Sequence, residues 1–126
     1  MSNEVRDDLK YTKTHEWLKV KGNKATVGIT DHAQGELTDI VYVELPAVGK
    51  TVKKGEELCV VESVKSVSEI YAPVSGKVTN VNKKLDDSPE TINKSPYEDG
   101  WLVELEIKDK SEINGLLDAS SYKKTI

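Results

Sequence analysis

In the segment E-S-V-K-S-V-S-E-I-Y-A-P-V-S-G-K-V, residues 62–78, Lys65 has a valine close on either side. Two runs rich in β-branched residues, 57–62 and 68–71, flank it. If these runs pair as antiparallel strands, Lys65 lies at the tip of a β-hairpin. Ala72-Pro73 then predicts a turn out of the hairpin. The ordinary interpretation of Lys65 is a solvated charge, but the tip lacks the Asn-Gly or Gly-Gly residues of tight hairpins, so another requirement selects its sequence.

Short strands punctuated by turns recur along the rest of the chain. Lys21-Gly22-Asn23 predicts the turn of one further hairpin, and Pro46 ends another apolar run. Strands of this number and spacing predict a mostly β protein, a small sandwich or barrel. The expected strands are 17–20, 25–29, 41–45, 57–62, 68–71, 76–81 and 101–107.

Helix signals are few and short. Asp31 is expected to cap a helix, with Gln34 completing a capping box. Ser88 before Pro89 predicts a further N-cap and a single turn over 89–93. Near the C-terminus, Ile113, Leu116 and Leu117 have helical spacing, and Asp118 is expected to cap a last short helix through Tyr122.

Composition restricts both size and function. The chain has 126 residues, of which 37% are hydrophobic and 32% charged, and this predicts one small globular domain, 1–126, with a core over about 10–122. The net charge is −4 and the pI about 5.3. Nucleic-acid binding requires a basic surface, so we expect no nucleic-acid partner.

The chain lacks the residues that a metal site or a catalytic nucleophile would need. The single cysteine, Cys59, excludes an internal disulfide, and its apolar strand neighbours predict a buried structural thiol. Cys59 with two histidines, His15 and His32, cannot supply a zinc site, and no H-E-x-x-H, P-loop or G-x-S-x-G motif occurs. We therefore expect no metal and no enzyme activity.

The N-terminus and the apolar runs bear on location. Residues 1–10 are polar and acidic, without the apolar region of a signal peptide or the pattern of a transit peptide. No apolar run approaches the ~20 residues of a membrane span. We expect a cytoplasmic monomer without a membrane partner, or a mitochondrial matrix protein if the chain is a mature eukaryotic form.

The Lys65 segment closely resembles the lipoyl-lysine region of glycine cleavage system H proteins. The generic lipoyl and biotinyl feature is a hairpin lysine followed by A-P-x-x-G, present here as A-P-V-S-G. More specific are H-E-W, I-T-D-H-A-Q and S-P-Y-E-D-G-W, which occur in the order of that family from about residue 10 to 122. The resemblance implies a barrel-sandwich hybrid, like a lipoyl domain, with a few short helices.

The resemblance also implies a function. Lys65 would carry lipoic acid in amide linkage, and the chain would act as a non-catalytic carrier. Glycine decarboxylase would load the arm with an aminomethyl group, aminomethyltransferase would unload it, and dihydrolipoyl dehydrogenase would reoxidise it. Lipoate ligase or octanoyltransferase, with lipoyl synthase, would install the cofactor.

In H proteins a hydroxyl and carboxylates line the cleft that receives the loaded arm. Matched residue by residue, these are Thr14, Glu16 and Glu69 here. The family can offer a histidine where this chain has Glu36, so that contact is not carried over. Without the resemblance these side chains are ordinary solvated polar residues. The residues that flank the lysine are Glu62, Ser63, Val64 and Ser66.

Three alternatives remain open. The first is a carrier of another class, either a biotinyl domain or a lipoyl domain of a 2-oxoacid dehydrogenase. Biotin carriers usually have A-M-K-M, where this chain has Val64 and Ser66 on either side of the lysine. The second is an H-like relay that donates lipoate to the carriers of 2-oxoacid dehydrogenases. The third is an unmodified structural domain in which Lys65 is idle.

Overall fold

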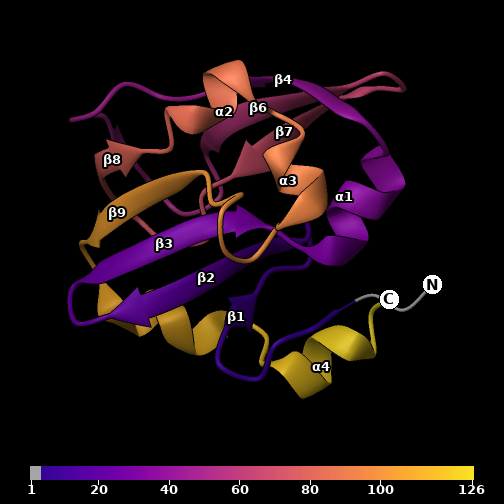
Figure 1. The fold of residues 1–126 in the computed structure, drawn as a ribbon. Coiled ribbons are helices and arrows are strands. Elements are labelled where there is room, and N and C mark those ends of the chain that lie inside the picture. Colours follow the sequence, from indigo (N-terminus) through magenta and orange to yellow (C-terminus); the bar gives the residue numbers. More distant parts are fainter. Residues whose placement is uncertain (1–3) are drawn as a thin grey trace.

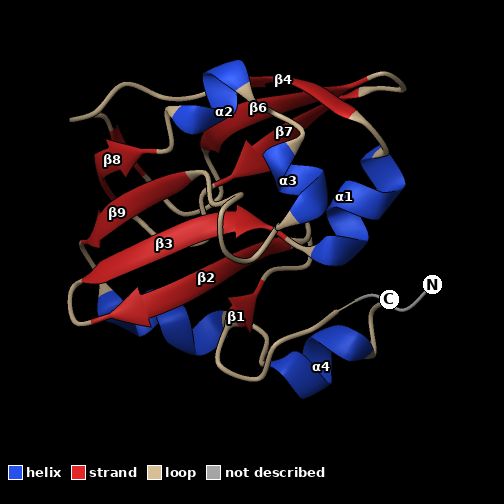
Figure 2. Ribbon diagram, in the orientation of Figure 1, coloured by secondary structure: helices blue, strands red, loops and turns tan. Residues whose placement is uncertain are grey.

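The computed structural model describes residues 4–126, in which nine strands form two sheets joined by short helices and turns (Figures 1 and 2). The larger sheet has the order β1-β2-β3-β9-β8-β5, and the smaller has the order β4-β6-β7. All pairings are antiparallel. The mostly β, two-sheet prediction is confirmed. The strands are β1 (Lys10–Tyr11), β2 (Glu16–Lys21), β3 (Lys24–Ile29), β4 (Ile40–Glu44), β5 (Thr51–Val52), β6 (Glu57–Ser63), β7 (Val67–Tyr71), β8 (Gly76–Val81) and β9 (Val103–Ile107).

The expected strands agree with the observed ones to within a residue or two. The largest difference is at β9, which begins at Val103 and not at Trp101. Trp101 N donates to Glu98 O, so this residue still closes the preceding turn. The two-residue strands β1 and β5 were not predicted, because an alternating pattern cannot be recognised over two residues.

The core lies between the two sheets. Valines at alternate positions of facing strands fill it, for example Val27 of β3, Val61 of β6 and Val78 of β8, all fully buried. Successive side chains of a strand point to opposite faces, so Leu18 enters this core while Trp17 packs on the other face of the larger sheet. The larger sheet is therefore covered on that side as well.

Aromatic residues form this second cluster. The rings of Tyr11 and Tyr122 stack with centroids 4.6 Å apart and an interplanar angle of 7°. Trp17 Nε1 donates to Pro96 O at 2.9 Å, which satisfies the buried indole. Figure 1 shows α4 beside β1, and Tyr122 of α4 belongs to the cluster.

The first helix begins one residue earlier than the expected cap implies. Thr30 is the N-cap, and its Oγ1 accepts from Ala33 N at 3.2 Å, so the assignment of Asp31 as the cap was wrong. Asp31 is instead the first helical residue, and its Oδ1 accepts from Gln34 Nε2 at 2.8 Å. Thr30 takes the cap because its Oγ1 is also fixed by a 2.7 Å hydrogen bond with the Tyr122 hydroxyl.

The expected cap at Ser88 was also wrong. Ser88 ends an unpredicted helix as its C-cap, and the next helix begins at Thr91, whose N–H bonds to the Ser88 carbonyl. The Asp118 cap is confirmed, with Oδ1 accepting from Ser121 N at 2.8 Å. The residues with helical spacing near 113 lie in and beside a 3₁₀ helix. The helices are α1 (Asp31–Leu37), α2 (Lys84–Asp87), α3 (Thr91–Lys94), η1 (Lys110–Gly115) and α4 (Ala119–Lys123).

Gly28→Ala is expected to destabilise the protein. Gly28 is the cross-strand partner of Trp17, and a Cβ at Gly28 would lie 2.6 Å from the Trp17 ring. Because the indole is buried and held by Pro96, we expect the free energy of unfolding to fall by about 2–3 kcal/mol. Urea unfolding measures this. Gly35→Ala is the matched control, since a Cβ there meets nothing within 4 Å and alanine favours a helix. Equal stability of the two variants would contradict the packing described.

Candidate functional site

The hairpin of β6 and β7 presents Lys65 as expected. The last strand pair is Glu62 with Val67, so the tip lies between them. Ser63 closes it: its N–H donates to Ser66 O at 2.8 Å, and its Oγ accepts from Ser66 N at 3.0 Å and Lys65 N at 3.2 Å. The turn has no Asn-Gly pair, and hydrogen bonds to the Ser63 hydroxyl stabilise it instead.

The tip rests against the end of α1. Val64 N donates to Asp39 O at 3.0 Å, and Lys65 Nζ donates to Glu36 O at 3.3 Å. Lys65 itself is exposed. The primary amine is therefore accessible to a modifying enzyme, and its backbone is held at a fixed place on the fold.

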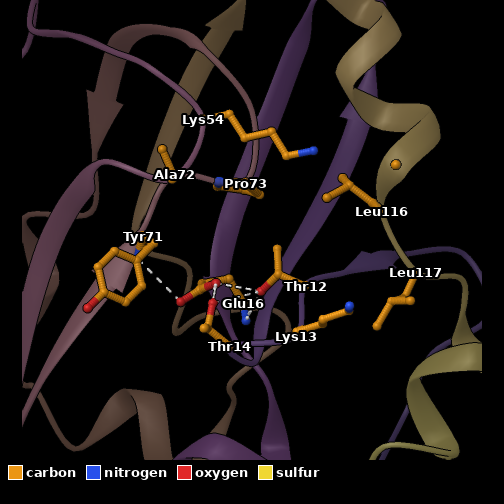
Figure 3. A pocket seen from close by; sticks show the side chains of 12 residues that line it. Thr12, Lys13, Thr14, Glu16, Lys54, Tyr71, Ala72, Pro73, Leu116 and Leu117 are labelled. Atoms are coloured by element: carbon orange, nitrogen blue, oxygen red, sulfur yellow. Dashed lines mark hydrogen bonds between the residues drawn. The ribbon is translucent and has the colours of Figure 1, made fainter.

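Glu16 is the most unusual polar residue of the site. Its side chain is 1% exposed. The hydroxyls of Thr12 and Thr14 each donate to Oε1 at 2.5 Å, and Tyr71 N donates to Oε2 at 3.2 Å (Figure 3). Burial raises the pKa of the Glu16 carboxyl, while these three hydrogen bonds oppose the rise. The result is a preorganised buried carboxylate.

Glu16 opens onto a cavity of about 250 Å³. Ala72, Pro73, Leu116 and Leu117 form apolar walls, so the cavity is well suited to an aliphatic chain (Figure 3). A cation that entered it would find the carboxylate on its wall.

A second hollow of about 230 Å³ is lined mainly by residues of α1 and β7. Glu36, which contacts Lys65, lines one part of it, and Thr14 lines both hollows. The rings of His15 and His32 are 4.8 Å apart at its wall. Burial, followed by the nearby His32, lowers the pKa of His15, whose Nδ1 bonds to the Tyr122 hydroxyl at 2.8 Å. The second hollow is therefore bounded by Glu36, which lies beside Lys65, and by Thr14, which lies beside Glu16.

Glu69 stands apart from the other predicted cleft residues. It is exposed on β7 and lines neither hollow. Its Oε2 accepts from the Tyr71 hydroxyl at 3.1 Å, while the Tyr71 N–H serves Glu16. Thr14 and Glu16 are thus brought together, and Glu69 is linked to them only through Tyr71.

Sequence reasoning did not find several residues of the site. Thr12 lies four residues before Glu16, and nothing in the sequence indicated that its hydroxyl would bond to the Glu16 carboxylate. Tyr71 acts through its backbone, so its side-chain type carried no information. His15 had been considered only for metal binding, and its φ of 71° is unusual for a residue with a side chain.

The remaining reactive and metal-ligating side chains form no further site among the described residues. Cys59 is buried as predicted, and burial raises the pKa of its thiol well above the ordinary value, so the thiolate is disfavoured. Among residues 4–126 no three His, Cys, Asp or Glu side chains lie close enough to hold a metal ion. None of the described helices is long and apolar enough to cross a membrane.

Comparison with known proteins identifies the family. Residues 9–126 match the family model for the glycine cleavage H-protein. The glycine cleavage system H protein of Endomicrobium trichonymphae is 59% identical over 122 residues, 97% of this chain and 98% of that one, and the H protein of Staphylococcus haemolyticus is 56% identical over 97% of each. A crystal structure of the Mycobacterium marinum H protein superposes with a TM-score of 0.85 at 39% identity, over 95% of this chain and 97% of that one. The chain therefore belongs to the glycine cleavage H-protein family.

Proposed function

We propose that Lys65 carries lipoic acid in amide linkage and that the chain is a non-catalytic shuttle of the glycine cleavage system. The observation that carries this proposal is the placement of Lys65. Its exposed amine lies at the tip of the hairpin and contacts Glu36, which lines the second hollow. Thr14 lines both hollows, and the first contains the buried carboxylate of Glu16.

The residues present fit such a cofactor. Lys65 offers a primary amine, the cavity beside Glu16 has apolar walls for an aliphatic chain, and Glu16 offers a buried negative charge. Bound lipoate would supply a disulfide that accepts the aminomethyl group left when glycine loses CO2, with a proton on the second sulfur. The electron pair of the broken C–C bond would reduce the disulfide. The tether confines this group near a docked active site and raises its effective concentration there.

The chain's own residues would hold and shield the cargo. Thr12, Thr14 and Tyr71 N orient the Glu16 carboxylate, and this carboxylate would pair with the ammonium of the cargo. The apolar walls would exclude water from the labile carbon. Glu69, held by the Tyr71 hydroxyl outside both hollows, would contribute a second negative charge near the cavity that Tyr71 lines.

The partners follow from this role. Glycine decarboxylase, aminomethyltransferase and dihydrolipoyl dehydrogenase would each meet the far end of the arm, and lipoate ligase or octanoyltransferase with lipoyl synthase would build it. The proposal gives the chain no turnover of its own, since the chemistry would take place in the active sites of these partners.

Carboxyl exchange tests the proposal. Purified glycine decarboxylase, labelled bicarbonate and glycine are combined with this chain, either lipoylated or unmodified. We expect label to enter glycine only with the lipoylated chain. Absence of exchange, together with transfer of lipoate from this chain to a 2-oxoacid dehydrogenase carrier in the presence of a lipoyl transferase, would favour the relay role instead.

A further inference from the structure

An exposed apolar patch adjoins Lys65. Among the described residues, seven large hydrophobic side chains are exposed, and four of them belong to β4 or to the hairpin. Exposed apolar groups gathered in one place mark interaction surfaces more often than isolated ones do. The four are Val41 (53% exposed), Tyr42 (49%), Val64 (68%) and Val67 (63%).

The strand registers place two members of this patch, Tyr42 and Val67, on the outer face of the smaller sheet. Tyr42 of β4, Glu62 of β6 and Val67 of β7 lie in one cross-strand row. Directly opposed residues point to the same side of a sheet, and the neighbouring row, Val43 and Val61, is buried in the core. Tyr42 and Val67 therefore flank Glu62 on the solvent side. We call this side, with its residues Tyr42, Glu44, Val60, Glu62, Val67 and Glu69, the outer sheet face.

The outer sheet face is acidic. The next row is Glu44, Val60 and Glu69, and the strands β4, β6 and β7 contain no lysine or arginine. The only nearby cation on the hairpin is Lys65 itself, although the whole chain has 18 basic residues. A second copy would place carboxylates against carboxylates across this face, so self-association is disfavoured.

The patch reaches Lys65 through β4. Val64 N donates to Asp39 O, and Ile40 pairs with Ser63, so the start of β4 runs beside the hairpin tip (Figure 1). An enzyme that acylates Lys65 must enclose the amine at the end of its four-carbon stem. Enzymes that act later bind the far end of the attached arm, so they need fewer contacts with the residues around Lys65.

We propose that the outer sheet face, with Tyr42 and Val67 as its apolar anchors, is the docking surface for the enzyme that acylates Lys65, a partner with an apolar centre and a basic rim. This inference rests on the proposed function. In the step that follows docking, unprotonated Nζ attacks the carbonyl of an acyl adenylate, the amide bond forms, the bond to AMP breaks, and a base of the enzyme takes the amine proton. Recognition thus depends on β4, which is remote in sequence from the hairpin.

Acylation rates test the inference. The full-length unmodified chain is incubated with a lipoate–protein ligase, lipoate and ATP, and the mass of the Lys65 peptide is followed over time. We expect Tyr42→Ser and Val67→Ser to lower kcat/KM by about tenfold or more, mainly through KM, as for loss of an interface anchor. Val48→Ser is the matched control, since Val48 is 58% exposed outside this face, and should change kcat/KM by less than about twofold.

A charge variant tests the same surface without removing an apolar side chain. Glu44→Lys should slow acylation at low salt, and the difference from wild type should shrink as salt screens the rim. Equal rates for wild type, Tyr42→Ser and Val67→Ser would overturn the inference and leave the proposed function standing. A wild-type chain that takes no acyl group would overturn both. Wild-type dimers that Tyr42→Ser abolishes would assign the face to self-association and overturn the inference.

Discussion

Lys65→Arg is expected to abolish both lipoylation and glycine cleavage without unfolding the protein. Arginine keeps the positive charge but offers no amine that an acyl donor can modify. The side chain is exposed, and its one hydrogen bond, from Nζ to Glu36 O, is 3.3 Å long. We therefore expect a change in the free energy of unfolding within about 0.5 kcal/mol.

Mass spectrometry and the exchange assay measure this result. Lys53→Arg is the matched control, because Lys53 is also an exposed loop lysine, and that variant should be lipoylated and active. Lipoylation of the Lys65→Arg chain at another lysine, with exchange activity retained, would show that the hairpin tip is not the attachment site.

Glu16→Ala is expected to shorten the lifetime of the methylamine-loaded protein by about tenfold or more. Glu16 is the buried carboxylate of the cavity, and a hydrogen bond to a charged group is worth about 1.5–3 kcal/mol, more than a factor of ten in a rate or equilibrium constant. Without it the cargo would have no fixed counter-charge. The measured quantity is the release of formaldehyde and ammonia from the isolated loaded chain.

Glu57→Ala is the control, because Glu57 is an exposed carboxylate on β6. Both variants are first checked for cooperative thermal unfolding, since Glu16→Ala also removes the acceptor of Thr12, Thr14 and Tyr71 N. Identical release rates from wild type and Glu16→Ala would exclude Glu16 as the residue that protects the cargo.

The same carboxylate predicts a pH dependence. Burial raises the pKa of Glu16 above the ordinary carboxyl value. The ionised form pairs with an ammonium, so protection is present above this raised pKa and is lost as the pH falls through it. Release from wild type should accelerate over that range, and Glu16→Ala should lack this step.

Much of the fold follows from local pattern. The alternation of K-A-T-V-G-I predicted β3, and Asp118 before a short run predicted the cap of α4. Where the pattern was ambiguous, tertiary contacts decided. Thr30 and Asp31 are both good N-cap residues, and the hydrogen bond of Thr30 to Tyr122, 92 residues away, selected the first.

The site was only partly accessible from the sequence. Hairpin geometry predicted that Lys65 is exposed at the tip, and the resemblance to H proteins implied its role as the attachment site. The environment of Glu16 was not, because its partner Tyr71 N lies 55 residues away and donates from the backbone. Thr14 and Glu69 look alike as polar residues of short segments, yet the fold turns Thr14 toward both hollows and leaves Glu69 outside them. Side-chain direction of this kind depends on how the two sheets meet.

The central claim is that Lys65 is the lipoyl attachment site. The most direct test is the intact mass of the chain isolated from its native host, followed by peptide mapping across residues 62–78. We predict a lipoyl increment on Lys65 alone. A biotinyl increment, or an unmodified Lys65 in a host with active lipoylation, would contradict the account.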